Sequence, residues 1–424
     1  MKYLIQNDWD IILDQDGTSY LWYKRIEDNN KVSGGKLIVN SKIDVKCTLG
    51  DDFFKFIKPI FVSPSKHISD IANGSLLLSI DVNFDGTFAA YSTSNNKLTF
   101  FNIKTGIDIA KFDVGSFTVT SVKFAPSGTI LMTSGYDMEL KIWWTNKMEN
   151  VACFKPGNMG AIERPCDLNL EPGGHSARIE DFSFLERGKN ICAFDTLGFI
   201  RFWDTSSQGC YFSCQIKEGI ELKAILAIPL ALTGNKPSQY LRNFNFSSNQ
   251  KYYRSDLKNN SIILATTSGL VIIDEHITSY LTTQIFENVS IRCLCHYENW
   301  LFCGCEDGSI STLNLNDINN NHGNFSVSNK PITHIKCLKL AEVNGIFIFH
   351  AMLDGVVRCV MFDLNSLTID PRKSIQYLGS DCYQITGLSL IEDFKLRHKS
   401  YLVFANKNAS VFHHEDLNLE KLYE

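Results

Sequence analysis

The sequence has 424 residues, and its composition excludes several classes of protein. A hydrophobic fraction of 44% is enough for a large core, and a net charge of −5 argues against a general nucleic-acid binder, which would be basic. No run of about 18 apolar residues is present, so we expect no membrane span. The 13 cysteines are odd in number and lie inside strand-like runs, which indicates buried thiols in a reducing compartment. The opening MKYLIQNDWD is unlike a signal peptide, so we expect a cytoplasmic protein that can also be nuclear.

Residues 1–70 show no clear repeat. Trp9, Ile12 and Leu13 have the spacing of one face of a short amphipathic helix. Residues 20–23 and 42–49 look like strands, and residues 59–69 are typical of a connector. We therefore divide the chain into an N-terminal segment, 1–70, and a repeat domain, 71–424.

The clearest repeat unit lies at Val119–Trp143. Its first part, VTSVKF, alternates apolar and polar residues with period 2, as a half-buried strand does. Pro126 and Gly128 then favour a tight turn into TILMTS. A second turn at 135–137 leads into a third strand that ends in two tryptophans. Strands joined by turns this short are neighbours in one antiparallel sheet.

The same unit recurs along the chain. Its marker is a turn residue, usually polar, that stands six positions before the end of the third strand. The markers are Asn95, Asp137, Leu197, Ser268, Asp307, Asp354 and Lys407. Most steps between them are 39 to 53 residues, which suits one four-stranded blade. The two longer steps carry insertions at Lys155–Gly173 and Thr233–Asn260. The unit resembles a WD40 repeat, and seven copies predict an all-β, seven-bladed WD40 β-propeller with a short N-terminal extension.

The last unit has only three strands, near 384–390, 401–405 and 409–414. An open ring would leave the apolar faces of two blades in water, so a fourth strand has to come from elsewhere. We expect the N-terminal segment to supply it, with the strand near Lys42–Leu49 as the donor.

Two motifs suggest chemistry. Residues 11–18, IILDQDGT, match the first motif of haloacid dehalogenase-type phosphatases, in which Asp14 would be the nucleophile and Asp16 the acid/base. No βαβ pattern follows, so we favour an exposed acidic turn. Four cysteines, Cys293, Cys295, Cys303 and Cys305, could bind Zn²⁺, but structural zinc usually uses a CxxC knuckle, and we favour buried thiols between blades. We expect no cofactor, no metal and no enzymatic activity.

His175 follows two glycines, and its unit ends at Trp203, in a GH…WD frame. In WD40 units such a histidine ties the first strand to the third, so we expect His175, Trp203 and Trp143 of the preceding unit to be structural. The aspartate expected before Gly198 is Leu197 here. Asp195, two residues earlier, is the candidate to replace it.

Three stretches together resemble the proteasomal ATPase-associated factor family. They are IQNDWDIILDQDG, FAPSGTILMTSGYDMELKIW and GHSARIEDFSFLERGKNICAFDTLGFIRFWD. The resemblance implies a non-catalytic assembly chaperone that binds the C-terminal helical domain of a proteasome base ATPase subunit and regulates docking on the core particle. The alternative is a WD40 scaffold or adaptor of another complex, in ubiquitin ligation or ribosome biogenesis. In either case we expect a monomer that binds neither nucleic acid nor membrane.

In WD40 propellers the loops between second and third strands lie on the narrower face. The residues expected to contact a partner there are Tyr136, Asp137, Glu139, Phe194, Asp195, Thr196, Glu306, Asp307, Leu353 and Asp354. Aromatic residues ringed by carboxylates would suit a basic helical partner. The alternative is that the aspartates cap their own turns.

Overall fold

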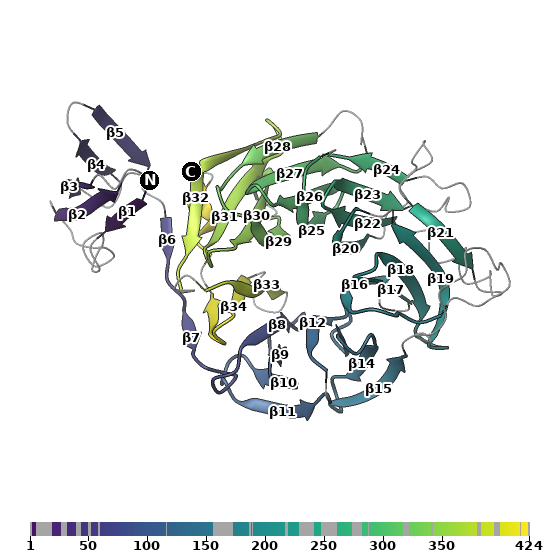
Figure 1. Cartoon of the computed structure of the whole chain (residues 1–424). Helices are drawn as coiled ribbons and strands as arrows, with labels where there is room; N and C mark the ends of the chain where they lie inside the picture. The colour runs from purple at the N-terminus through teal and green to yellow at the C-terminus, as the bar shows by residue number, and fades with distance from the viewer. Residues whose placement is uncertain are drawn as a thin grey trace.

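A ring of seven β-sheets dominates the computed structural model (Figure 1). The structure describes residues 2–5, 19–26, 32–39, 44–49, 52–57, 60–115, 117–155, 173–185, 188, 190–216, 219–228, 241–246, 261–273, 282–286, 288–316, 322–340, 342–379, 383–393, 399–415 and 417–422. The predicted seven-bladed propeller is confirmed. An eighth sheet precedes it and consists of β1 (Lys2–Ile5), β2 (Ser19–Ile26), β3 (Val32–Val39), β4 (Asp44–Leu49) and β5 (Asp52–Ile57).

Each blade is built around four strands, and the innermost strand lines the axis of the ring. Blade one contains β8 (Leu77–Val82), β9 (Phe88–Thr93), β10 (Lys97–Asn102) and β11 (Asp108–Asp113). Blade two contains β12 (Val119–Phe124), β13 (Ile130–Gly135), β14 (Leu140–Trp144) and β15 (Glu149–Phe154). Blade three contains β16 (Ile179–Leu185), β17 (Asn190–Asp195), β18 (Phe199–Asp204), β19 (Gly209–Ile216) and an added edge strand, β21 (Leu241–Phe246). Blade four contains β20 (Leu222–Ile228), β22 (Ser261–Thr266), β23 (Gly269–Ile273) and β24 (Thr282–Ile285).

The remaining three blades complete the ring. Blade five contains β25 (Ile291–Tyr297), β26 (Trp300–Cys305), β27 (Ser309–Asn314) and β28 (His322–Ser326). Blade six contains β29 (Ile332–Leu338), β30 (Gly345–Met352), β31 (Val357–Asp363), β32 (Thr368–Tyr377) and a parallel edge strand, β6 (Ile60–Val62). Blade seven contains β33 (Ile385–Asp393), β34 (Lys399–Asn406), β35 (Val411–His414) and β7 (Lys66–Ile68). A 3₁₀ turn, η2 (Leu419–Leu422), follows.

The core lies between blades. The described buried residues form seven clusters, one at each interface between neighbouring blades. The second strands are buried on both faces, as all six residues of β17 and all eight of β30 show. Such strands appear in the sequence as continuous apolar runs, because both sides pack against other strands.

A β-bulge recurs at one position of every blade. The second residue of each innermost strand has no partner in the neighbouring strand, and the pairing shifts there. The bulged residues are Leu78, Thr120, Glu180, Lys223, Arg292, Thr333 and Thr386. Because three threonines share this position with a leucine, a glutamate, a lysine and an arginine, no single residue type in the sequence indicated the feature.

The ring is closed by the N-terminal segment. Strand β7 pairs antiparallel with β35, matching Ile68 with Val411, and the His67 ring stacks on Phe412 at 4.6 Å. The expected donor was wrong: the strand near Lys42–Leu49 corresponds to β4, which pairs with β3 and β5. The donor is instead the segment directly before blade one, which the sequence had indicated as a connector. A strand directly before blade one lies next to blade seven, where the ring has to close.

Several other predictions fall partly or wholly outside the described residues. The helix expected at Trp9–Leu13 and most of the insertion at 155–173 are among them. The described part of the second insertion is β21, which pairs with β19 in blade three. The described residues contain no helix of the length and hydrophobicity that a bilayer crossing requires.

Candidate interaction surface

One hydrogen bond, repeated in all seven blades, brings two sets of loops to the same face. The N–H of a residue in the turn between second and third strands donates to the carbonyl oxygen of the residue before the innermost strand, at 2.8–3.1 Å. The donor–acceptor pairs are Ser94–Leu76, Tyr136–Thr118, Thr196–Arg178, Thr267–Glu221, Glu306–Ser290, Leu353–Pro331 and Lys407–Gln384. We call this side of the ring the upper face. All seven sequence markers lie in these turns.

Six of the twelve exposed large hydrophobic side chains of the described residues lie on the upper face. They are Leu76, Phe117, Tyr136, Leu197, Leu353 and Tyr383, each between 41% and 55% exposed. They belong to blades six, seven, one, two and three, which are consecutive around the ring, and we call them the apolar arc. In blades four and five the described upper loops carry ion pairs instead, Lys223–Glu221 at 2.7 Å and Arg292–Glu306 at 3.0 Å.

Tyr136 is held in place by a residue of the next blade. Its hydroxyl accepts a hydrogen bond from the Arg178 guanidinium, which also lies over the tyrosine ring, 4.8 Å from the centroid. Arg178 Nε donates in turn to Glu180 at 3.0 Å. Tyrosine and arginine are enriched among residues that dominate binding energy, and an ordered side chain loses less entropy on binding. The predicted contact Tyr136 is therefore both exposed and pre-organised.

The acidic residues predicted for this face are engaged within the protein. Asp137 and Glu139 both pair with Lys141, at 2.6 and 3.1 Å. The Glu306 carboxylate pairs with Arg292.

Two further aspartates are bound by their own turns. Asp307 accepts a bond from the Ser309 N–H at 2.9 Å, and Asp354 accepts one from the Val356 N–H at 3.3 Å. The turn-capping alternative thus describes Asp307 and Asp354, and Asp137 likewise accepts a bond from the Glu139 N–H at 3.3 Å. Of the carboxylates expected to attract a basic partner, those of Asp137, Glu139 and Glu306 are paired with cations.

Phe194 and Asp195 lie in the core, contrary to their predicted place at the surface. Both are at the end of β17, with 0% and 1% exposure. Phe194 packs at the interface of blades three and four, and strand β17 is buried on both faces, so neither side chain reaches a partner. Of the neighbouring predicted contacts, Thr196 is exposed.

Asp195 instead completes the frame of blade three. Its Oδ2 lies 2.9 Å from His175 Nδ1 and 3.0 Å from Arg201 Nη1, and all three side chains are fully buried. Asp195 thus replaces the aspartate missing at Leu197, as the sequence suggested. Burial lowers the pKa of His175, so its ring is neutral at neutral pH. Arg201 was missed, although a charged residue inside the apolar run FIRFWD signals a buried ion pair.

The two tryptophans of the frame are also inside the blades. Trp143 Nε1 donates to Thr133 Oγ1 at 3.0 Å, which ties β14 to β13. Trp203 packs against Phe154 of blade two and against the His175 ring, with centroids at 5.5 and 5.9 Å.

The four clustered cysteines face two different interfaces. Cys293 and Cys295 pack with residues of blade six, whereas Cys303 and Cys305 pack with residues of blade four. Strand pairing explains the split, because Cys303 lies opposite Leu294 rather than opposite a cysteine. Burial raises the pKa of all four thiols. No group of three metal-ligating side chains occurs among the described residues, and these four sulfurs do not converge.

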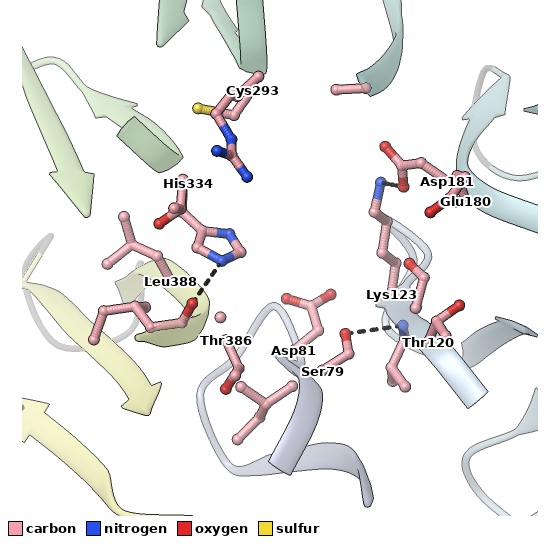
Figure 2. A pocket seen from close by; sticks show the side chains of 18 of the residues that line it. Ser79, Asp81, Thr120, Lys123, Glu180, Asp181, Cys293, His334, Thr386 and Leu388 are labelled. Atoms are coloured by element: carbon pink, nitrogen blue, oxygen red, sulfur yellow. Dashed lines mark hydrogen bonds and ion pairs between the residues drawn. The ribbon is translucent and has the colours of Figure 1, made fainter. Parts of the chain in front are cut away.

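A channel of about 640 Å³ follows the axis of the ring, and the innermost strands of all seven blades line it (Figure 2). Polar side chains on one blade bind the backbone of the next. Ser79 Oγ accepts from the Val122 N–H at 3.1 Å, and Asp81 accepts from the Phe124 N–H at 2.8 Å. Such bonds join the innermost strands of neighbouring blades beside the channel. His334 also lines the channel, and burial lowers its pKa to about 4.

A closed ring of seven blades, each built around four antiparallel strands, together with a match to a WD40 repeat, defines a seven-bladed WD40 β-propeller. The family model "WD domain, G-beta repeat" matches residues 109–143. This range begins in β11 and ends in β14, so the sequence repeat starts with the outer strand of one blade and finishes in the next. The Asp14–Asp16 motif lies outside the described residues.

Comparisons with known proteins agree on the fold. A curated relative, the U3 small nucleolar RNA-associated protein 21 homolog of Schizosaccharomyces pombe, is 24% identical over 165 residues. That match covers 33% of this chain and 18% of the relative, so the matched stretch spans about a fifth of the relative's length. The structure titled "Crystal structure of RRP9 WD40 repeats" superposes with a TM-score of 0.58 at 9% identity, covering 84% of this chain and 99% of the other. The "Structure of U3-55K" gives 0.57 at 10% identity, covering 83% and 99%.

Proposed function

We propose that this propeller is a non-catalytic binding platform within a larger assembly, and that the apolar arc of its upper face contacts a protein partner. The observation that carries the proposal is that half of the exposed large hydrophobic side chains of the described residues lie in the upper-face loops of five consecutive blades. Three of them, Phe117, Tyr136 and Tyr383, are aromatic, and aromatic anchors supply much of the binding energy at protein interfaces. Tyr136, held by Arg178, is the central anchor.

We propose ribosome biogenesis as the process that this platform serves, with a nuclear location. The support is the similarity to the U3 small nucleolar RNA-associated protein 21 homolog, together with propellers titled RRP9 and U3-55K among similar structures. The latter two resemblances are of fold alone. In this proposal the chain binds protein subunits of the particle through its upper face.

A second candidate is the proteasome assembly chaperone that the sequence resemblance implies. It is favoured by a separate observation, the DMELKIW and RGKN motifs of blades two and three. The partner would then be the C-terminal helical domain of a base ATPase subunit. Both candidates use the propeller as a rigid recognition surface without turnover.

Affinity purification separates the candidates and tests the surface. The tagged full chain is recovered from its own cells, and co-purifying proteins are quantified by mass spectrometry. Enrichment of pre-ribosomal U3 proteins supports the first candidate, and enrichment of base ATPase subunits supports the second. The double variant Tyr136→Ala/Leu197→Asp should reduce recovery at least about tenfold, since losing two central contacts costs over 1.4 kcal/mol.

The matched control is Val151→Ala, a side chain 48% exposed on the outer strand β15. This variant should recover the partner as the wild type does. If neither set of proteins is enriched, both assignments fail. If the double variant recovers as much as the wild type, the upper face is not the binding surface.

A further inference from the structure

The axial channel carries more positive than negative charge. Five Lys or Arg residues line it against three carboxylates, in a chain whose net charge is −5. The cations are Lys123, Lys223, Arg292, Lys336 and Lys407, and the carboxylates are Asp81, Glu180 and Asp181. A concave site with an excess of one sign focuses its field on the solvent inside it. The lining of the channel is therefore net positive although the chain as a whole is net negative.

The carboxylates and three of the five cations come from different blades. The carboxylates belong to blades one and three, and Figure 2 shows Lys123 of blade two beside Asp181. Lys223, Arg292 and Lys336 come from blades four, five and six, which are consecutive. His334 lies among these cations and stays neutral, because its pKa is lowered to about 4.

The carboxylates are already engaged. Asp81 accepts bonds from the Phe124 N–H at 2.8 Å and the Ser389 hydroxyl at 3.1 Å. Asp181 accepts one from the Ile225 N–H at 3.3 Å and pairs with Lys123 at 2.5 Å.

The cations of blades four to six differ in their partners. Lys223 and Arg292 pair with Glu221 and Glu306, whose side chains are 72% and 47% exposed at the rim. Partly exposed pairs contribute little to stability, and an anion that enters the channel would compete with the two glutamates for these cations. Lys336 is exposed to the channel, and the structure describes no ion pair for it.

These cations stand at successive depths. Lys407 belongs to an upper-face turn, and Lys223 and Arg292 are the bulged second residues of their strands. Lys336 is the fifth residue of β29, three positions further in than a bulge, which corresponds to about 10 Å along a strand. An entering anion would thus meet positive charge at the mouth and again deep inside.

We propose that the channel receives an extended acidic segment of the partner protein, inserted from the upper face. The inference rests on the proposed binding platform and specifies the partner's charge. The apolar arc favours a peptide over a small free anion, because hydrophobic residues flanking the acidic segment would pack beside the mouth. The expected segment is therefore acidic, the reverse of the basic partner that the sequence suggested, because the cations that line the channel outnumber its carboxylates.

The test uses the full chain and a fluorescein-labelled deca-glutamate peptide, with deca-lysine as the charge-reversed probe, in anisotropy titrations. Deca-glutamate should bind and weaken as salt rises, and deca-lysine should not bind. Lys336→Gln and Arg292→Gln should each weaken binding at least about fivefold, with unchanged thermal midpoints. Lys147→Gln, a lysine 61% exposed on the turn between β14 and β15 on the opposite face, is the matched control and should bind normally.

Three outcomes would overturn the proposal. One is absence of deca-glutamate binding, and another is equal weakening by Lys147→Gln and the channel variants. The third is binding of inositol hexakisphosphate, lost in Lys336→Gln, without peptide binding, which would make the channel a small-anion site. These titrations are independent of the purification experiment. The proposed partner can therefore be wrong although the channel binds acidic peptides, and the channel proposal can be wrong although the partner is correct.

Discussion

The Asp195–Arg201–His175 cluster removes three ionisable side chains from water together. Their mutual contacts at 2.9–3.0 Å compensate part of the lost hydration, and the N–H groups of Leu197 and Phe199 each donate to Asp195 Oδ1 at 3.1 Å. Arg201 Nε also donates to the Gly173 carbonyl at 3.0 Å. Breaking a buried pair by removing one partner is strongly destabilising, because an uncompensated charge remains.

We therefore predict that Asp195→Asn lowers the free energy of unfolding by about 3 kcal/mol. Urea denaturation measures it. The matched control is Asp307→Asn, which weakens a turn cap at the surface and should cost at most about 1 kcal/mol. Equal losses in the two variants would mean that the buried ion pair contributes no more than an exposed cap.

Buried histidines make stability depend on pH. Burial lowers the pKa of His350 to about 3 and that of His414 to about 4, and both side chains are fully buried. In the unfolded chain a histidine has a pKa of about 6.5, so below this pH the unfolded chain takes up protons that the folded chain refuses. Stability should accordingly be full above pH 6.5 and fall towards pH 4, by about 2 kcal/mol per histidine at pH 5.

The variant His414→Phe tests this at one residue. The His414 ring stacks on Phe404 at 5.3 Å and lies edge-on to Tyr377, so phenylalanine preserves the packing while removing the titrating group. Denaturation midpoints measured between pH 5 and 7 should vary less than in the wild type. An unchanged pH slope would exclude His414 as a contributor.

At the level of single elements, the innermost strands approach their neighbours very closely. At Gly387 of β33, an added Cβ would lie 2.4 Å from the Ile80 carbonyl oxygen of blade one. The contact crosses the seam where the ring closes, so glycine is required there for close approach of two backbones.

Gly387→Ala should consequently destabilise the protein by about 1–3 kcal/mol, as overpacking does. Thermal unfolding measures the loss. Gly209→Ala is the control, because its nearest neighbour would be the Ser207 hydroxyl at 3.3 Å, and it should change stability by less than about 0.5 kcal/mol. If Gly387→Ala leaves the thermal midpoint unchanged, the backbones of blades seven and one can move apart at little cost.

The closing strand has only three residues but completes the last blade. Besides the β7–β35 pairing, the Ser65 hydroxyl accepts a bond from the Glu415 N–H at 2.9 Å. A chain that starts at residue 59 should unfold cooperatively near the wild-type midpoint. A chain that starts at residue 70 should lose roughly 5–10 °C and aggregate, because β32 and β35 both become unpaired edges.

Circular dichroism with light scattering distinguishes these two chains. A synthetic peptide spanning residues 59–70, added in excess, should restore the lost midpoint by occupying the vacant edge. Identical melting of both chains would show that β7 is dispensable for closure.

At the scale of the whole molecule, the ring was predictable because its signal repeats. Period-2 strands and seven turn markers each carry weak information, and their recurrence identifies the propeller. The β-bulges were not predictable, because residues as different as Leu78, Glu180 and Thr386 occupy that position.

The candidate site was predicted in part, for physical reasons. Tyr136, Thr196, Glu306 and Leu353 are exposed at the turns where the markers placed them. Phe194 and Asp195 precede the turn and are buried, because the second strand stays inside the blade until its last residue. The charge of the surface was the least predictable property. Asp137 and Glu139 lie in the turn before β14 and pair with Lys141 at the start of that strand. Glu306 lies in a turn and pairs with Arg292 of β25, 14 positions earlier.

Closure by β7 also has a consequence for the timing of synthesis. Ile68 and Val411 are paired, yet 343 positions of chain separate them. At roughly 5–20 residues per second, the ribosome needs about 20–70 s to deliver the second after the first. Throughout that interval blade one and the growing arc have no partner on their open sides. The apolar faces of blade one and of the most recently synthesised blade therefore stay exposed to solvent during this time. We expect general folding factors to bind these faces until the final blade emerges.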